Sequence, residues 1–303
     1  MSTDVRKIIE KADVEVNDLL DGGKLNPTQS DEFYRMVIDQ PTLLNEIRTV
    51  QMPSDKYNID KVGFGSRMWR SAPSEGTALK AEDRYRPTFD QIQLDAKYIM
   101  SELRVPYQVL EDNIEKGTLQ QTFMQMAAAR TSADWEELLI LGDTSSNDPY
   151  LSLFDGALQL PDHEYDGSGL TAIDKTLFKA ALQSMPSKYL RDLAAMSMYL
   201  SHYNTIEYRD QLADRGTDMG DVNYRGRPSL YGFGVPIKAS AFMPNSKMLF
   251  THPGNLIMGI HRDVMIETDR DIRTRELIVV MTARLDVKME EPDAAVVVTG
   301  LDV

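Results

Sequence analysis

Residues 86–112 read RPTFDQIQLDAKYIMSELRVPYQVLED, and this stretch decides the fold. Its first half alternates apolar and polar side chains, which is the period of a strand with one buried face. The apolar members are Ile92, Leu94, Ala96 and Tyr98, and the polar members are Gln91, Gln93, Asp95 and Lys97. We therefore predict an extended segment from Arg84 to Met100.

Another extended segment is predicted just before it, from Tyr57 to Trp69. Helix signals are missing between residues 56 and 98, where prolines and glycines recur. The two segments would form a hairpin with a polar, glycine-containing tip at Ser71–Asp83. At ~3.3 Å per residue, its arms would project on the order of 40 to 50 Å. Because a two-stranded ribbon is marginally stable alone in water, we expect it to rest on another surface.

The longest helical pattern follows the quoted stretch. Thr118, with Gln121 three residues later, has the form of a capping box, and Gly142 is a typical helix stop. The roughly 23 residues between them would make a rod of ~35 Å at a rise of 1.5 Å per residue. We expect this helix to be a scaffold for the rest of the fold.

Residues 170–261 have the pattern of an α/β unit. A capping box at Thr171-Ala-Ile-Asp174 predicts a helix, Ala194–Leu200 predicts a strand, and Ser201 is expected to cap a helix through Leu212. Strands of similar type recur to the end of the chain. They include the alternating apolar residues from Leu277 to Val287 and the apolar run Ala294–Val298.

Three apolar groups lie near the N-terminus. Residues 4–20 have helical spacing and end at Gly22-Gly23, and a second helical pattern runs from Ser30 to before Pro41. The third group is Leu43, Leu44, Ile47 and Val50. We interpret the three as surface helices, or as an arm lying on another molecule. The first twenty residues hold acids every few positions, so no signal peptide is expected.

The composition bounds the classes of function. Lys and Arg number 33 and Asp and Glu 47 among 303 residues, a formal net charge of −14 at pH 7. This excess argues against binding of nucleic acids or anionic membranes through bulk charge. The absence of cysteine excludes disulfides and cysteine nucleophiles and fits a reducing cytoplasm. No stretch approaches the ~20 apolar residues of a membrane span.

No recognisable combination of catalytic residues occurs. The histidines lack the spacing of a zinc site; they are His163, His202, His252 and His261. His163-Glu164 is expected in a loop, where Asp162 and Asp166 leave a cation site as the alternative to a solvated turn. Nucleophile elbows, phosphate loops and dinucleotide motifs are absent, and two G-x-G pairs, at 63–65 and 232–234, are interpreted as bends.

Charged clusters are given a simple interpretation. The adjacent pairs Glu136-Glu137 and Glu290-Glu291 are read as solvated charge, because neighbouring side chains diverge. Residues 270–276 mix both signs and are expected to form a loop with local or intersubunit ion pairs. We therefore name no catalytic, cofactor-binding or metal-ligating residue and predict that the protein is not an enzyme and has no cofactor.

The order of these motifs resembles the tailed-bacteriophage major capsid protein family, which has the Hong Kong 97 phage capsid fold. In that family an extended hairpin leads through a strand, here similar to Tyr98–Val105, to an acidic turn, a spine helix and a Gly-Asp stop, here Gly142-Asp143. Also similar are Leu230–Pro244 with the strands after it, and the closing Arg284–Val298 with its Pro-x-Ala turn. The resemblance covers roughly residues 56 to 301.

This resemblance implies an α+β fold in five parts. They are an N-terminal arm (1–50), an E-loop (51–98), a peripheral domain with the spine helix (99–159), an axial domain (160–261) and the returning strands of the peripheral domain (262–303). Gly63, Gly65 and Gly76 are predicted to be flexing points of the E-loop.

The resemblance also implies the partners. The chain would form pentamers and hexamers in an icosahedral shell around double-stranded DNA, which it would enclose without sequence-specific binding. It would be part of the virion, assembled in the host cytoplasm with separate scaffolding, portal and cement proteins and without a membrane. Some members crosslink an E-loop Lys to a late Asn. Here Lys56, Lys61 and Lys80 are present but no Asn follows Asn255, so we expect noncovalent shells.

Two alternatives stay open at this point. An encapsulin, which is a cellular nanocompartment of the same fold, would enclose cargo protein instead of DNA. An acidic soluble enzyme with a dispersed active site would form small discrete oligomers.

Overall fold

The structure, a computed structural model, describes residues 43–63, 87–106, 119–169, 173–213, 230–261 and 265–301, with single positions at 69, 71, 79, 80 and 84. The two predicted N-terminal helices, the capping residues Thr118 and Thr171, and Gly65 and Gly76 lie outside the described residues.

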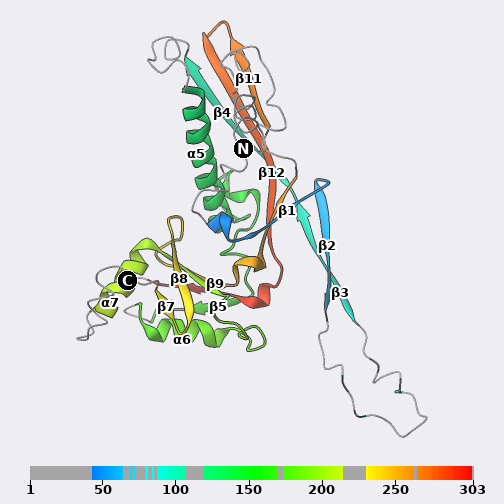
Figure 1. The fold of residues 1–303 in the computed structure, drawn as a ribbon, viewed down its shortest axis with the longest axis vertical. Coiled ribbons are helices and arrows are strands. Elements are labelled where there is room, and N and C mark those ends of the chain that lie inside the picture. Colours follow the sequence, from blue (N-terminus) through cyan, green and yellow to red (C-terminus); the bar gives the residue numbers. More distant parts are fainter. Residues whose placement is uncertain are drawn as a thin grey trace, which may run out of the picture.

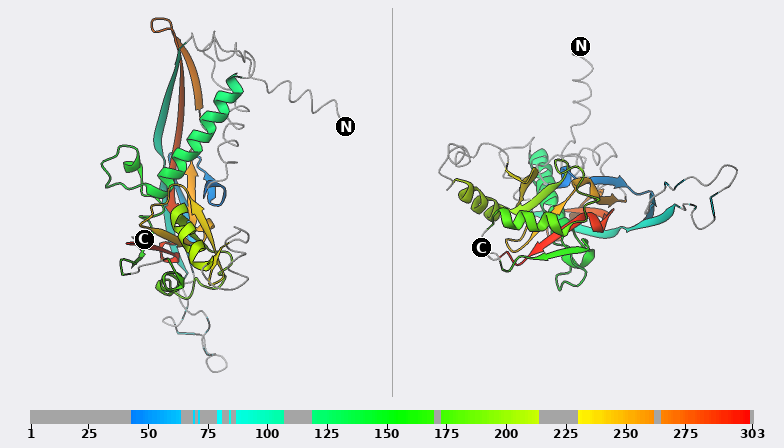
Figure 2. Two further views of the ribbon diagram at one scale, coloured as in Figure 1. Left: turned by 90° about the vertical axis from the view of Figure 1, so that its left-hand side faces the viewer. Right: turned by 90° about the horizontal axis from the view of Figure 1, so that it is seen from below.

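A five-stranded sheet is built around one long strand, β12 (Glu276–Met289). Strand β4 (Lys97–Pro106) pairs antiparallel along one edge of β12, and β11 (Met265–Asp271) and β10 (Leu256–Ile260) pair along the other. Strand β1 (Arg48–Gln51) is parallel to β10. Helix α5 (Leu119–Leu141) lies alongside this sheet (Figures 1 and 2).

The apolar residues of α5 and the sheet share one core. Trp135, Leu138 and Ile140 pack with Leu285 and Val287 of β12. The prediction of a 23-residue helix is confirmed, and it ends where expected, with the Gly142 amide donating to the Leu138 carbonyl at 2.9 Å. Among the described residues, no helix is long and apolar enough to cross a membrane.

A six-stranded sheet forms the other part of the body (Figure 1). Its order is β5 (His163–Asp166), β13 (Ala295–Thr299), β9 (Met248–Thr251), β6 (Ser197–Ser201), β8 (Val235–Ser240) and β7 (Tyr231–Gly232). Helices α6 (Lys175–Ser184) and α7 (His202–Ala213) pack on it. Phe178 and Phe250 are fully buried in its core, which is separate from that of α5.

Capping residues explain where these helices begin. The Asp174 carboxylate accepts hydrogen bonds from the Thr176 and Leu177 amides, so Asp174 itself is the cap of α6. Ser201 caps α7 as predicted, because its hydroxyl accepts from the Asn204 amide at 3.1 Å. Short 3₁₀ helices complete the body; they are η1 (Leu43–Asn45), η2 (Leu151–Leu153), η3 (Pro253–Asn255) and η4 (Pro292–Ala294).

Pairing of the two predicted hairpin arms is confirmed, and they form a two-stranded ribbon. Most of the predicted tip, Ser71–Asp83, lies outside the described residues. Strands β2 (Lys56–Gly63) and β3 (Thr88–Asp95) pair antiparallel over eight positions and project away from the body (Figure 1). One detail of the prediction is wrong, because the single strand from Arg84 to Met100 is divided. The chain pairs with β2 up to Asp95 and with β12 from Lys97 onward, so β3 and β4 belong to different sheets.

Two further local predictions are wrong. The apolar group Leu43–Val50 is not a helix of ordinary length: it forms the single turn η1 and then β1, which gains a full strand partner in β10. His163-Glu164 is not in a loop, because it begins β5, which is parallel to β13. Residues 272–275 do form a turn as expected, joining β11 to β12.

Candidate functional site

The histidines are distributed over separate elements. His252 caps η3 by accepting from the Gly254 amide at 3.0 Å, and Nε2 of His163 lies 3.7 Å from a carboxylate oxygen of Asp293. His202 begins α7, and His261 follows β10. In the part of the chain that the structure describes, no three His, Asp or Glu side chains are grouped as a metal site would need.

Glu136 is a buried anchor, and its interpretation as solvated charge is wrong. The residue is 5% exposed, and its Oε1 accepts from the Leu43 amide at 3.3 Å and the Ser240 hydroxyl at 3.0 Å. Beside it, Glu46 accepts from the Tyr199 hydroxyl and from Lys238, both at 2.7 Å. These bonds fix residues 43–47 against α5 and the six-stranded sheet, at the point where the described chain begins.

Burial, reinforced by the bond to Glu46, raises the pKa of Tyr199 above its ordinary value. The phenol therefore stays protonated and remains a donor to the Glu46 carboxylate.

The two faces of the ribbon differ. On one face Tyr57 and Ile59 are half-buried and Leu94 is fully buried, packing on Met52 and Ile257 of the body. On the other face Val62 and Phe89 are paired side by side, and they are 55% and 77% exposed. Apolar side chains paired in this way on a projecting ribbon are suited to burial against another molecule.

A buried carboxylate holds the base of the ribbon. Asp286 of β12 is 2% exposed; its two oxygens accept from the amides of Asp95 at 2.7 Å and Val287 at 2.9 Å. Burial raises the pKa of Asp286. The neighbouring Asp95 behaves in the opposite way, because a hydrogen bond from Lys97 at 2.6 Å lowers its pKa. The residues at which the chain changes from β3 to β4 are thus held by charge as well as by sheet pairing.

A second contact at the base centres on Asp55. Its carbonyl accepts from the Ala96 amide at 2.9 Å. Its carboxylate lies 2.6 Å from Nη1 of Arg284 and 3.2 Å from Nε2 of His261, whose other ring nitrogen is 3.1 Å from the Met52 carbonyl. Asp55 therefore joins the start of the ribbon to two strands of the five-stranded sheet.

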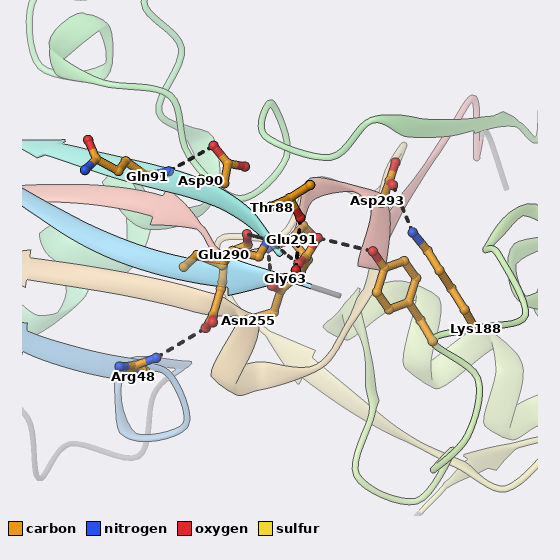
Figure 3. A network of polar contacts seen from close by, with 12 residues as sticks. Arg48, Gly63, Thr88, Asp90, Gln91, Lys188, Asn255, Glu290, Glu291 and Asp293 are labelled. Atoms are coloured by element: carbon orange, nitrogen blue, oxygen red, sulfur yellow. Dashed lines mark hydrogen bonds and ion pairs between the residues drawn. The ribbon is translucent and has the colours of Figure 1, made fainter. Parts of the chain in front are cut away.

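The corner between the two sheets carries a further polar network (Figure 3). Glu290 and Glu291 follow β12, and the interpretation of this pair as solvated charge is also wrong. Glu290 pairs with Arg48 at 3.2 Å, and the Glu291 carboxylate contacts Lys61 of the ribbon and accepts from the Tyr189 hydroxyl at 3.2 Å. The Asn255 side chain holds the backbone of Glu291 from both sides, at 2.8 and 2.9 Å.

Other apolar side chains are exposed at the edges of the body. Tyr98 and Met100 lie on β4, Tyr203 and Ile206 on α7, and Ile272 on the β11–β12 turn. The alternation in sequence predicts that Tyr98 lies on the same face as Leu94. Because the strand partner changes from β2 to β12 at Ala96, the two side chains lie in different sheets. The apolar–polar alternation continues through Ala96, so nothing in the sequence marks the change. Ile272 is 86% exposed. Its exposure could have been predicted from the sequence, because it is the one apolar residue among the charged and polar residues 270–276.

Comparison with known proteins identifies the family. No family model matches the chain. The curated "Putative prophage capsid protein YqbE" of Bacillus subtilis (strain 168) is 41% identical over 302 residues, which are 95% of this chain and 96% of that protein. The chain belongs to the phage capsid protein family.

Solved capsid structures have the same fold. A chain of the satellite phage P4 procapsid with its size determination (Sid) protein has a TM-score of 0.70 at 14% identity, covering 99% of this chain and 98% of its own length. The mature capsid of bacteriophage PhiM1 gives 0.58 at 14% identity, over 86% and 87%. A virus-like particle from Pyrococcus furiosus gives 0.55 at 13%, over 88% and 96%. The expected α+β capsid fold of the Hong Kong 97 type is confirmed.

Proposed function

We propose that this capsid protein self-assembles as pentamers and hexamers into the icosahedral head around the double-stranded DNA of a tailed phage. The observation that carries the proposal is the 41% identity to a prophage capsid protein over nearly the full length of both chains. The relative also makes a phage capsid better supported than an encapsulin. We also propose that the role is structural and without enzymatic activity, and the same relationship supports this.

The projecting ribbon supports assembly physically. Its outer apolar pair, Val62 and Phe89, is exposed in the single subunit and would be buried on a neighbouring copy. Many such contacts per subunit make a closed shell stable even when each contact is weak.

The division into five parts is part of the proposal: arm 1–50, E-loop 51–98, peripheral domain 99–159, axial domain 160–261 and returning strands 262–303. The ribbon falls within 51–98, and α5 falls within 99–159. Two strands pair across the boundary between 160–261 and 262–303. Strand β10 of the axial part pairs with β12 of the returning part, and β13 of the returning part pairs with β9 of the axial part. Flexing at Gly63, Gly65 and Gly76 is also proposed.

We propose that the shell is not covalently crosslinked. The side chain of Asn255 is engaged within the subunit, donating to Thr251 and Glu291 and accepting from the Glu291 amide. Lys61 is likewise held by Glu291. Because both side chains are engaged within the subunit, these contacts support noncovalent cohesion of the shell. From the relationship to a prophage capsid protein we also propose a virion protein that is assembled in the host cytoplasm with separate scaffolding, portal and cement proteins, with no membrane and with DNA enclosed without sequence-specific contacts.

Electron microscopy and sedimentation velocity of the expressed protein test the proposal. Closed shells, or rings of five and six, are expected, and DNA inside native particles would distinguish a phage head from an encapsulin with protein cargo. Deletion of residues 70–83 should impair assembly, and unchanged particles would contradict the E-loop assignment. A monodisperse dimer or tetramer under all conditions, with neighbouring gene products present, would favour the enzyme alternative.

A further inference from the structure

The ribbon has two polar attachments to the body, and between them Tyr57, Ile59 and Leu94 pack on Met52 and Ile257. The first is its base, where Asp286 binds the Asp95 amide and the Asp55 carboxylate binds Arg284 and the ring of His261. The second is Lys61, which lies five residues beyond Lys56, or ~16 Å at 3.3 Å per residue. Of these contacts, the one at Lys61 lies furthest from the base, so it is the best placed to fix the direction of the ribbon.

The contact at Lys61 is built from polar groups that are already held in place. The ammonium group contacts the Glu291 carboxylate and donates to the Glu290 carbonyl at 3.1 Å, so one side chain binds two consecutive residues. Asn255, which is buried, fixes the Glu291 backbone through two hydrogen bonds. The groups that bind the Lys61 ammonium are therefore held in place without help from the ribbon.

The same carboxylate also reaches the chain segment between α6 and β6. Tyr189, in the chain segment before β6, donates to Oε2 of Glu291 at 3.2 Å, and the adjacent Lys188 is 3.4 Å from Asp293. Figure 3 shows Glu291, Lys188 and Asp293 around the corner after β12. Glu291 thus connects three parts of the subunit, which are the ribbon, the end of the five-stranded sheet and the segment between α6 and β6.

We propose that Lys61 is a positioning residue for assembly: clasped by Glu291, it fixes the direction in which the ribbon leaves the body and, through it, the angle at which neighbouring subunits meet. The second half of this inference rests on the proposed function. Preorganisation of the ribbon before contact would lower the entropic cost of each intersubunit contact. It would also narrow the range of shell curvatures that the subunits can adopt.

The direction of the ribbon can be measured in the subunit itself. Because the chain has no cysteine, two exposed positions can carry spin labels: Gln91→Cys on β3, on the face of the ribbon opposite Lys61, and Glu207→Cys on α7. We expect a narrow distance distribution by double electron–electron resonance in the otherwise unaltered chain and a broad one with Lys61→Met. Lys56→Met, on the same strand at the base, is the control and should leave the distribution narrow. Equal widths for Lys61→Met and the unaltered labelled chain would overturn the inference.

The consequence for assembly is tested by charge reversal. Lys61→Glu and Glu291→Lys should each broaden the distribution of particle diameters in electron micrographs, and the double variant should restore a narrow one. A double variant as heterogeneous as both singles, or singles with particles of normal diameter, would overturn the link to assembly. If the unaltered chain formed no shells, the proposed function would fail, while the spin-label distances would still decide the role of Lys61.

Discussion

The amide of Gly156 donates to the carbonyl of Gly142 at 2.8 Å, so two glycines that lie 14 positions apart are in backbone contact at the end of α5. A Cβ on Gly142 would lie 2.5 Å from the Phe154 carbonyl oxygen and 2.7 Å from that of Leu138. The helix stop is thus also a packing site at which only glycine fits.

Gly142→Ala should therefore destabilise the subunit. The added methyl group meets backbone atoms, which cannot move aside cheaply, and overpacking of this kind costs about 1–3 kcal/mol. Gly169→Ala is the control, because a Cβ there meets nothing within 4 Å, and it should change the free energy of unfolding by less than about 0.5 kcal/mol. Urea unfolding measures both, and equal midpoints for the two variants would contradict the prediction.

Glu136→Ala should cost about 1–3 kcal/mol, because the Leu43 amide and the Ser240 hydroxyl lose their acceptor inside the protein. The adjacent Glu137 offers a matched comparison, since it is only half-buried. Glu137→Ala should have a much smaller effect on thermal unfolding. If the two substitutions proved equivalent, Glu136 would not anchor residues 43–47.

Tyr199→Phe removes the donor to Glu46 and keeps the ring. Because the acceptor is a carboxylate, the loss is expected to be about 1.5–3 kcal/mol in the free energy of unfolding. Tyr203→Phe, on the exposed surface of α7, should be nearly neutral in the same denaturation experiment. A Tyr199→Phe protein as stable as the Tyr203→Phe protein would exclude a stabilising role for this bond.

Two neighbouring carboxyls should give pH dependences of opposite sign. The pKa of Asp286 is raised by burial, so its protonation stabilises the folded state, and this contribution is lost as pH rises through the folded pKa. The stability of the unaltered chain relative to Asp286→Asn should therefore increase from pH 7 to about pH 4, near the ordinary pKa of Asp.

The pKa of Asp95 is lowered by Lys97, so its contribution is present above the ordinary pKa and lost as pH falls through the folded one. The advantage of the unaltered chain over Asp95→Asn should therefore shrink below about pH 4. Urea unfolding at several pH values checks both trends. If the stability relative to the unaltered chain had the same pH dependence for Asp286→Asn and Asp95→Asn, burial would not be the main influence on the pKa of Asp286.

Phe89→Gln should weaken assembly without weakening the subunit, because the ring is 77% exposed before assembly. Loss of even 1.4 kcal/mol per contact corresponds to about a tenfold weaker contact, so the protein concentration needed for shells should rise. Gln91→Ala, two residues along the same face of β3, is the control. Light scattering during assembly reports the difference, and identical concentration dependences would place Phe89 outside the intersubunit contact.

The sequence by itself determined the elements whose signals are local. The length of α5, its stop at Gly142, the Ser201 cap and the alternation in β3 all depend on residues within a few positions of one another. Hydrogen bonds along a helix and side-chain direction along a strand follow from this local order. The resemblance to the capsid protein family rested on the order of these elements along the chain.

Tertiary structure alone decided which strands pair and which charges are buried. The change from β3 to β4 at Ala96 is fixed by Asp286, which is 191 positions from Asp95, and Glu136 is buried by Leu43, 93 positions away. The Glu290-Glu291 pair binds the ribbon through Lys61, which is 229 positions from Glu290. The physical reason is that the energy of a polar group depends on its final neighbours, and distant neighbours are selected by the packing of the whole chain.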